Sequence, residues 1–393
     1  MGDINPKAGF GKYPVPRAGQ WSPDVLGPGF EAQTLQLLPD DEGEVLATIV
    51  RHDAARDPHA LEGTPKEPIF KALYIHGWND YYHQRELARQ VALAGGQFFG
   101  LDLRKYGRSW RKNQTFGWTQ NLADYDEDIA EALLIMGEDL PIVLMGHSTG
   151  GLTATLWAAH HPGRLAGLWL NSAWLELQTS SIARVPTKQA VQLIASREPR
   201  RVLPTGGNDF YGISLRGWNK DDGEMPSDLV PYKDDPSLAG WGLIPEWKAT
   251  GRSIYAGWLA AVITGHQEVA GGLDIDCPVM NISSTHTYEG SEWSSDVRYQ
   301  DTVLDADLIA ERGARLGQNV LIRRFGGVHD LALSIPPVRQ QLWSATLHWL
   351  RSSVLGQETF AQTESADLFR LRVPKPSDVQ LAPKQGAARK ALP

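Results

Sequence analysis

One serine in this chain stands in a pattern that favours nucleophilic chemistry. It is Ser148, in the run G-H-S-T-G from Gly146 to Gly150, with an apolar stretch at residues 141–145 before it and a helix-forming stretch at 152–160 after it. Strand, tight turn and helix in this order are typical of a nucleophile elbow, which exposes the serine hydroxyl on a strained turn. Because the chain has 39 glycines, chance could also supply this spacing, and partners for the serine are needed.

The first partner is a base, because a serine hydroxyl is a poor nucleophile until its proton is taken up. Beyond the middle of the chain the candidates are His286, His329 and His348. His329 follows the apolar stretch 319–325 in a glycine-containing loop, where a fold with an elbow places its base. His348 lies inside a predicted helix, and His286 precedes the best candidate acids. We therefore predict that His329 is the base.

The second partner is a carboxylate between serine and histidine, which orients the base. Asp301 and Asp305 bracket a short apolar stretch just before a predicted helix, and we prefer Asp301 as the acid. Asp305 stays open as the alternative acid, although an aspartate at such a boundary is also a common helix N-cap. The less favoured acids are Asp296, Glu289 and Glu292.

Acyl chemistry also needs two N–H groups that stabilise the oxyanion, one of them from the residue after the nucleophile. That residue is Thr149, and the second amide is predicted at Trp78, in the loop H-G-W-N that follows an early strand. Gly77 would let the backbone approach closely, and His76 is expected to brace the loop. We predict substrate contacts from Gly77, His147, Trp174 and Trp258.

The elements that position these residues alternate between short apolar strands and amphipathic helices. Strands are predicted at 72–75, 97–101, 141–145, 165–170, 278–283 and 319–325, and helices at 84–93, 122–136, 305–316 and 337–354, after a hairpin over 34–38 and 44–50. This alternation predicts an α/β fold with a mostly parallel sheet flanked by helices. Functional residues on such a sheet follow the carboxyl ends of strands, where His76, Asp102, Ser148 and Asn171 are expected.

The organisation of the chain has four predicted parts. Residues 1–30 form an extended N-terminal arm, 31–172 and 273–355 the core, 173–272 an inserted cap or lid, and 356–393 a loosely ordered tail. The cap loses the alternating pattern, carries predicted helices at 187–196 and 249–264, and is rich in tryptophan. A segment of this length between two strands of the sheet is best explained as a cover over their carboxyl ends.

Charge and composition exclude several classes of function. The net charge is −8, from 38 basic and 46 acidic side chains, which argues against nucleic-acid binding. One basic cluster is predicted to be a solvated loop; it comprises Arg104, Lys105, Arg108, Arg111 and Lys112. The single cysteine, Cys277, is expected to be buried and cannot form an internal disulfide. No motif for a metal or a phosphate-bearing cofactor occurs, so neither is predicted.

The sequence carries neither a membrane-spanning pattern nor a secretory pattern, and our expectations for location and partners rest on this. No apolar stretch approaches the roughly 18 residues of a membrane span, and the start has no secretory pattern. We expect a soluble, cytoplasmic protein with no stable membrane insertion, acting on a small molecule. Apolar surface on the cap could also form a homodimer.

Together these motifs resemble the α/β-hydrolase superfamily, and within it the monoglyceride-lipase and lysophospholipase branch of serine hydrolases, which is serine aminopeptidase-like. The resemblance rests on the elbow, the His76-Gly77 loop, a D-x-x-x-x-G-x-S run from Asp102, the Asp301-to-Asp305 segment and Gly327-Val328-His329. It implies a triad of Ser148, His329 and Asp301, with Trp78 and Thr149 as the oxyanion amides. The chain departs from that branch at Asn79, where glycine is usual, and in a longer stretch over 284–300.

Three functions are compatible with these residues. The first is hydrolysis of a small apolar or aromatic carboxylic ester through an acyl-enzyme. The alternative is an amidase or aminopeptidase-like hydrolase with the same triad, whose acidic anchor for an ammonium group would be Asp221, Asp222, Glu224 or Glu246. The third is a ligand-binding protein with a closed site.

Overall fold

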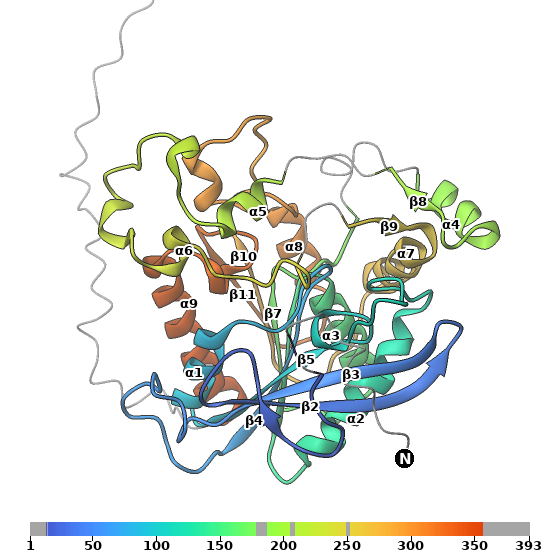
Figure 1. The fold of residues 1–393 in the computed structure, drawn as a ribbon, viewed down its shortest axis with the longest axis horizontal. Coiled ribbons are helices and arrows are strands. Elements are labelled where there is room, and N and C mark those ends of the chain that lie inside the picture. The colour runs from blue at the N-terminus through green and yellow to red at the C-terminus, as the bar shows by residue number, and fades with distance from the viewer. Residues whose placement is uncertain (1–12, 14, 178–186, 205–208, 249–251, 357–393) are drawn as a thin grey trace, which may run out of the picture.

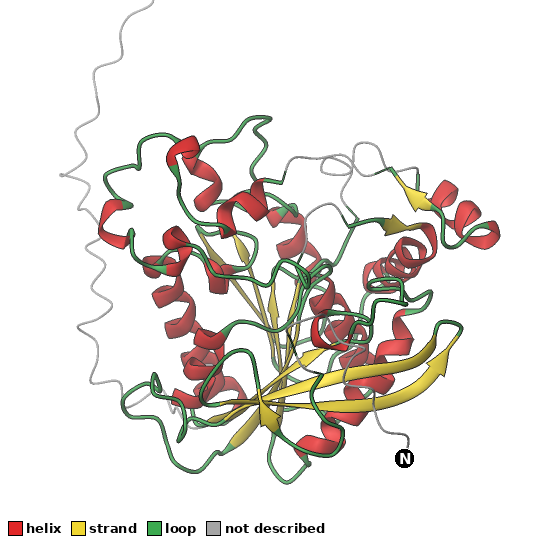
Figure 2. Ribbon diagram, viewed as in Figure 1, coloured by secondary structure: helices red, strands yellow, loops and turns green. Residues whose placement is uncertain are grey.

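The chain folds around one sheet that runs through its centre (Figures 1 and 2). The computed structural model describes residues 13, 15–177, 187–204, 209–248 and 252–356. Within these residues the main sheet has the strand order β1-β2-β3-β5-β4-β6-β7-β10-β11. The strands are β1 (Ser22–Pro23), β2 (Phe30–Asp40), β3 (Gly43–His52), β4 (Phe70–Ile75), β5 (Gly96–Asp102), β6 (Ile142–His147), β7 (Gly167–Asn171), β10 (Val279–Ser284) and β11 (Val320–Phe325). From β5 to β11 all pairs are parallel, whereas β1, β2 and β3 pair antiparallel.

Helices cover both faces of the parallel part, which confirms the predicted fold class. They are α1 (Arg85–Leu93), α2 (Tyr125–Met136), α3 (Thr149–His160), α8 (Ala306–Gly313) and α9 (Pro336–Trp349). In β6, Val143 and Met145 pack with the cluster that includes α1 and α9, whereas Leu144 packs with the cluster under α2, α3 and α8. Because both faces are covered, every residue of β4, β6 and β7 is buried, and the strands are mostly apolar, with Lys71 in β4 and the terminal His147 and Asn171 as the polar exceptions.

The cap segment, residues 173–272, lies above the carboxyl ends of the strands (Figure 1). It contains α4 (Lys188–Arg197), α5 (Phe210–Leu215), α6 (Pro236–Ala239), α7 (Ala256–Ala270) and a small ladder of β8 (Val202–Leu203) with β9 (Ile254–Tyr255). The helix predicted over 249–264 is wrong at its start. Residues 249–251 lie outside the described residues, and Tyr255 is extended in β9 pairing, so the helix begins at Ala256. None of the described helices is long and apolar enough to cross a membrane.

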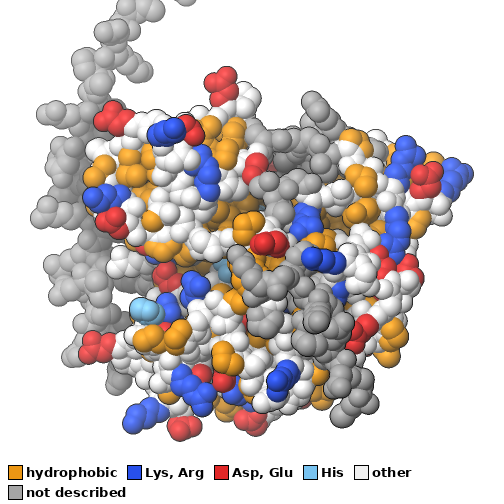
Figure 3. Space-filling view, in the orientation of Figure 1, with side chains coloured by type: hydrophobic (Ala, Val, Ile, Leu, Met, Phe, Trp, Pro, Cys, Tyr) orange, Lys and Arg blue, Asp and Glu red, His pale blue; other side chains and the backbone are white. Residues whose placement is uncertain are grey.

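The ends of the chain fall largely outside the described residues. Of the predicted N-terminal arm, residues 1–12 and 14 are not described, while β1 pairs antiparallel with β2 and so joins the sheet edge. Of the predicted tail, residues 357–393 lie outside the described residues. On the face drawn in Figure 3, acidic and basic side chains are interspersed, and hydrophobic side chains gather over the cap segment.

The basic cluster is not a solvated loop, and that prediction was wrong. Arg104, Lys105, Arg108 and Arg111 are all buried, and Lys112 alone of the five is exposed. The reason is that acidic side chains from distant segments meet them. Arg104 binds Asp128 and Glu127, and Lys105 binds Asp40 and Glu42.

Arg108 joins the N-terminal segment to the end of β5. Its guanidinium is 2% exposed and makes a bidentate pair with Asp24, at 2.7 and 2.8 Å, and a 2.9 Å contact with Asp102. Asp102 also accepts the Arg108 and Tyr82 backbone N–H groups. Gly107 is required here, because a Cβ would lie 2.3 Å from the Asp102 carboxylate. Asp102 is thus fully occupied in bracing this loop.

His266 joins α7 to the start of the cap segment. It lies on α7, and its Nε2–H donates to the Trp174 carbonyl at 2.8 Å, just beyond the end of β7. Burial is the main reason that the pKa of His266 falls to about 4. The ring is therefore neutral in the folded protein at pH values where an exposed histidine is charged.

We expect Arg108→Met to lower the free energy of unfolding by about 3–5 kcal/mol, because it leaves two carboxylates buried without their cation. Urea unfolding at neutral pH measures this change. Lys112→Met, at the exposed neighbour in the same loop, is the control and should change stability by less than about 0.5 kcal/mol. Equal effects of the two substitutions would contradict the account of Arg108.

The low pKa of His266 should make the protein less stable in acid. A folded-state pKa below the unfolded value means that the unfolded chain binds the extra proton, so stability falls as the pH drops from 6.5 towards 4. In His266→Gln, the slope of unfolding free energy against pH in this window should be smaller by up to about 1.4 kcal/mol per pH unit. Urea titrations at several pH values test this, and an unchanged slope would show that His266 does not carry the effect.

Candidate active site

Ser148 lies in the turn between β6 and α3, with an unusual backbone conformation. Its φ is 54° and its ψ is −121°, a region that side chains rarely adopt and that the surroundings must enforce. The Ser148 N–H donates to the Asn171 carbonyl at the end of β7, at 3.1 Å, and the Ser148 carbonyl accepts the Trp174 N–H at 2.9 Å. The neighbouring strand and the start of the cap segment therefore hold the turn.

The glycines around Ser148 are needed for close packing. A Cβ on Gly146 would lie 2.5 Å from the Gly150 carbonyl oxygen, and one on Gly150 would lie 2.2 Å from the His76 carbonyl oxygen. Real side chains do not approach backbone so closely, so larger residues would force the turn open. The glycines two residues to either side of Ser148 therefore have a physical reason.

His329, the predicted base, contacts the predicted acid. It lies in the loop after β11, and its Nδ1 is 2.8 Å from Oδ2 of Asp301. Both side chains are buried, at 3% and 0% exposure. A carboxylate can only accept, so Nδ1 carries the proton and the neutral ring presents a lone pair at Nε2. Among the described residues that Nε2 has no hydrogen-bond partner.

Asp301 is held in place by hydrogen bonds. Its Oδ1 accepts the backbone N–H groups of Val303 and Leu304, each at 2.8 Å, which leaves Oδ2 for His329. Its own backbone pairs with His286 and Tyr288, in a short bridge across the 284–300 stretch. These three donors fix the orientation of the carboxylate towards His329.

Asp305, the alternative acid, is engaged elsewhere. It is the N-cap of α8, and its Oδ1 accepts the N–H groups of Asp307 and Leu308, each at 3.0 Å. The structure therefore brings Asp301, and not Asp305, to His329. The other candidates lie at the surface: His286 and His348 are exposed, as are Asp296, Glu289 and Glu292.

The loop that carries His329 is fixed by a residue that the sequence reasoning missed. Asp330 is fully buried and accepts from Asn171 Nδ2 at 2.7 Å and from Gln84 Nε2 at 2.9 Å. Asn171 also accepts the Leu331 N–H. The available signals were the position of Asn171 at a strand end and a carboxylate directly after the predicted base.

Two rings flank His329. The ring of His147 lies 4.9 Å away, and the ring of Tyr211 on α5 meets it edge-on at 5.4 Å. His147 is buried, and burial lowers its pKa to about 4, so it adds no positive charge beside the base. Because His147 directly precedes Ser148, this contact also brings the His329 loop beside the elbow. Tyr211 was not predicted, since nothing in the sequence marks a cap-segment tyrosine as a neighbour of the base.

The loop after β4 closes over the elbow from the other side. A Cβ on Gly77 would lie 3.0 Å from the Ser148 Cβ, which shows how near the two backbones are. His76 braces this loop: its Nδ1–H donates to the Gly77 carbonyl at 2.7 Å, and its Nε2 accepts the Leu103 N–H at 3.2 Å. Thr149 is the first residue of α3, so its N–H has no partner within the helix.

Asn79, where the resembling branch usually has glycine, has a φ of 56°. This is the left-handed region, which asparagine tolerates better than most residues. The substitution therefore keeps the backbone path of the loop.

The predicted tryptophans form one cluster at the site. The Trp258 ring on α7 lies 5.6 Å from that of Trp78 and 6.2 Å from that of Trp174. Trp258 and Trp174 are buried, and Trp78 is half-buried. Within the described residues no group of three His, Cys, Asp or Glu side chains is placed to hold a metal ion.

The sequence matches known proteins over part of its length. Residues 67–224 match the model of the family described as Serine aminopeptidase, S33. Human monoglyceride lipase is 28% identical over 189 residues, which is 46% of this chain and 55% of that protein. The chain therefore spans about half the length of this relative.

Solved structures match over more of the chain. The monoacylglycerol lipase of Paleococcus ferrophilus superposes with a TM-score of 0.51 and 19% identity, covering 73% of this chain and 96% of its own. A soluble variant of monoglyceride lipase from Saccharomyces cerevisiae superposes with a TM-score of 0.53 and 15% identity, covering 87% and 97%. At such identities the likeness concerns the fold. The sheet topology, the elbow and the structural matches show that the chain has the α/β-hydrolase fold. Its sequence is similar to the serine aminopeptidase family model and to monoglyceride lipase over part of that fold.

Proposed function

We propose that the protein is a serine carboxylic-ester hydrolase with Ser148 as nucleophile, His329 as base and Asp301 as the orienting acid. The observation that carries the proposal is the buried pair of Asp301 and His329, with Nε2 left unpartnered next to an elbow of positive φ. An ordinary turn would need none of these three features. Together they support an acyl-transfer site.

The chemistry follows in two steps. Nε2 of His329 takes the Ser148 proton as Oγ attacks the ester carbonyl, and the Trp78 and Thr149 amides stabilise the oxyanion. The tetrahedral intermediate collapses, the ester C–O bond breaks, and the alcohol leaves with the proton from Nε2. Water, deprotonated by the same nitrogen, then attacks the acyl group and releases the acid and Ser148. Asp301 stays ionised and stabilises the imidazolium in both steps.

An apolar or aromatic substrate suits the surroundings. The cluster of Trp78, Trp174 and Trp258 offers flat apolar faces, which favour offset or tilted contacts with another ring. Gly77 and His147 adjoin Ser148 and would contact the reacting ester group. The neutral state of His147 also suits an uncharged substrate.

A second candidate function is suggested by the description of the matching family, which names an aminopeptidase. That reaction needs a carboxylate that is free to bind an ammonium group. Asp221, Glu224 and Glu246 are exposed, and Asp222 binds Arg216 at 2.7 Å. Asp80, which is buried after the Trp78 loop, already pairs with Lys248 at 2.7 Å. Because Asp222 and Asp80 are already paired, we favour ester hydrolysis over aminopeptidase activity. Faster turnover of alanine p-nitroanilide than of p-nitrophenyl acetate would reverse this preference.

The role of Ser148 predicts that Ser148→Ala abolishes hydrolysis of p-nitrophenyl esters, because no other group can carry the acyl chain. Fluorophosphonate labelling of the wild type, followed by mass spectrometry of the modified peptide, should identify Ser148. The variant should unfold at the wild-type denaturant concentration. Wild-type turnover in the folded variant, or labelling elsewhere, would contradict the proposal.

The choice of acid predicts different outcomes for two matched substitutions. Asp301→Asn should lower kcat by about 10⁴-fold, since an amide in place of the carboxylate disfavours the tautomer and the imidazolium. Asp305→Asn should leave kcat close to wild type, because asparagine is an equally good helix N-cap. Steady-state kinetics on one p-nitrophenyl ester compare the two. The reverse pattern would assign the acid to Asp305.

A further inference from the structure

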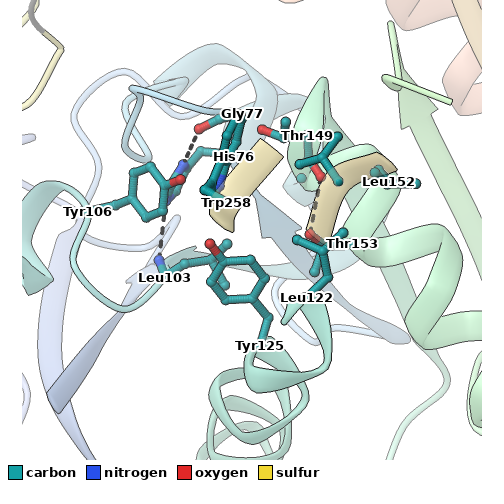
Figure 4. Close-up of a pocket in the computed structure, with 12 residues that line it drawn as sticks. His76, Gly77, Leu103, Tyr106, Leu122, Tyr125, Thr149, Leu152, Thr153 and Trp258 are labelled. Atoms are coloured by element: carbon teal, nitrogen blue, oxygen red, sulfur yellow. Dashed lines mark hydrogen bonds between the residues drawn. The ribbon is translucent and has the colours of Figure 1, made fainter. Parts of the chain in front are cut away.

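A small cavity lies beside the two proposed sources of the oxyanion amides. It borders Thr149, which would supply one amide, and Gly77, in the loop that would supply the other. It has a volume of about 10 Å³, which is roughly the room that one water molecule needs. Gly77 and Thr149 form one side of it (Figure 4), and both lie near Ser148, since Thr149 follows it in the chain and a Cβ on Gly77 would lie 3.0 Å from the Ser148 Cβ. The other residues around it are His76, Leu103, Tyr106, Leu122, Tyr125, Gly150, Leu152, Thr153, Trp258 and Val262.

The far side of the cavity is made of large, buried side chains. Tyr106 and Tyr125 come from the core, while Trp258 and Val262 come from α7 of the cap segment. Figure 4 shows Tyr106, Tyr125 and Trp258 turned towards one another around the space. Tyr106, Tyr125 and Trp258 are each at most 4% exposed. These three side chains are enclosed by other parts of the protein and do not face solvent.

Ring contacts hold this wall in place. The Tyr106 ring meets the rings of His76 and Phe116 edge-on, at 5.0 and 5.1 Å between centroids. The Trp258 ring packs against Trp78 and Trp174, at 5.6 and 6.2 Å between centroids. Moving Trp258 would therefore disturb this aromatic packing.

The position of the cavity gives it a role in ester hydrolysis. An ester whose carbonyl oxygen lies at the amides of Trp78 and Thr149 has its carbonyl carbon at Ser148, and the acyl substituent extends from that carbon. The cavity is the internal space that adjoins the same loop and the same helix start. A methyl group matches its size, and a longer chain meets Trp258.

We propose that this cavity is the acyl pocket and that Trp258 restricts the enzyme to esters of short acids, acetyl esters above all. The inference rests on the proposed ester hydrolysis and adds the class of acyl group. The alcohol part, which departs from the other side of the carbonyl carbon, is not restricted by this wall. Trp258 thus acts as a specificity-determining residue.

The test is a chain-length series of p-nitrophenyl acetate, butyrate and octanoate. For the wild type we expect kcat/KM to fall by about tenfold or more between acetate and octanoate, in line with the discrimination that a closed apolar pocket gives. In Trp258→Ala the ratio of octanoate to acetate turnover should rise by about tenfold or more. Val262→Ala, a milder change in the same wall, should raise butyrate turnover relative to acetate.

Leu259→Ala is the matched control. Leu259 is buried on the same helix, next to Trp258, and is absent from the cavity wall. Its variant should keep the wild-type ratio, which separates loss of packing in α7 from enlargement of the pocket. Thermal unfolding of each variant establishes that it is folded, and Val262→Ala tests the wall if Trp258→Ala does not fold.

Two outcomes would overturn the inference. A wild type that prefers octanoate, or a folded variant of the wall with the wild-type ratio, would show that the acyl chain lies elsewhere while ester hydrolysis stands. Absence of turnover for every ester, together with no fluorophosphonate labelling of Ser148, would instead overturn the proposed function and the pocket with it.

Discussion

The backbone of Ser148 is the constraint on which the rest of the site depends. A non-glycine residue at φ 54° and ψ −121° costs of the order of 1–3 kcal/mol, and only the surrounding structure can maintain it. Here the restraints come from Asn171 on the next strand, from Trp174 at the start of the cap segment, and from the contact of Gly150 with the His76 carbonyl. The elbow is therefore stable only in the assembled sheet, although its sequence is five residues long.

Around this turn the protein collects polar groups in a buried space. Asp301, Asp330 and His329 are almost fully excluded from solvent, and His147 is neutral beside them. Burial of two carboxylates is tolerated because each receives several donors: backbone N–H groups and His329 for Asp301, and two side-chain amides and a backbone N–H for Asp330. In a space of low dielectric such fixed donors act strongly. Among the described residues, Nε2 of His329 has no hydrogen-bond partner, and neither has either ring nitrogen of His147.

The sheet and its strands could be predicted from the sequence because the spacing of apolar residues and the composition of each segment are local properties. The sequence alone could not separate Asp301 from Asp305, and the structure explains why. Each carboxylate accepts two backbone N–H groups from the residues two and three positions on, so the local hydrogen-bond pattern is the same. Asp301 is fully buried and contacts His329, 28 residues away along the chain, whereas Asp305 is half-buried. The basic cluster was misread for a similar reason, since its partners, such as Asp24, are far away in sequence.

The long stretch before Asp301 connects the acid to the cap segment. Arg298 is 2% exposed, and its Nη1 donates to the carbonyls of Ser214 and Ser237, at 2.7 and 2.6 Å. Its guanidinium also lies over the rings of Trp218 and Trp293. Separating this part of the cap segment from the core would break those bonds three residues from the group that orients His329. These bonds therefore tie the cap segment to the loop that carries Asp301.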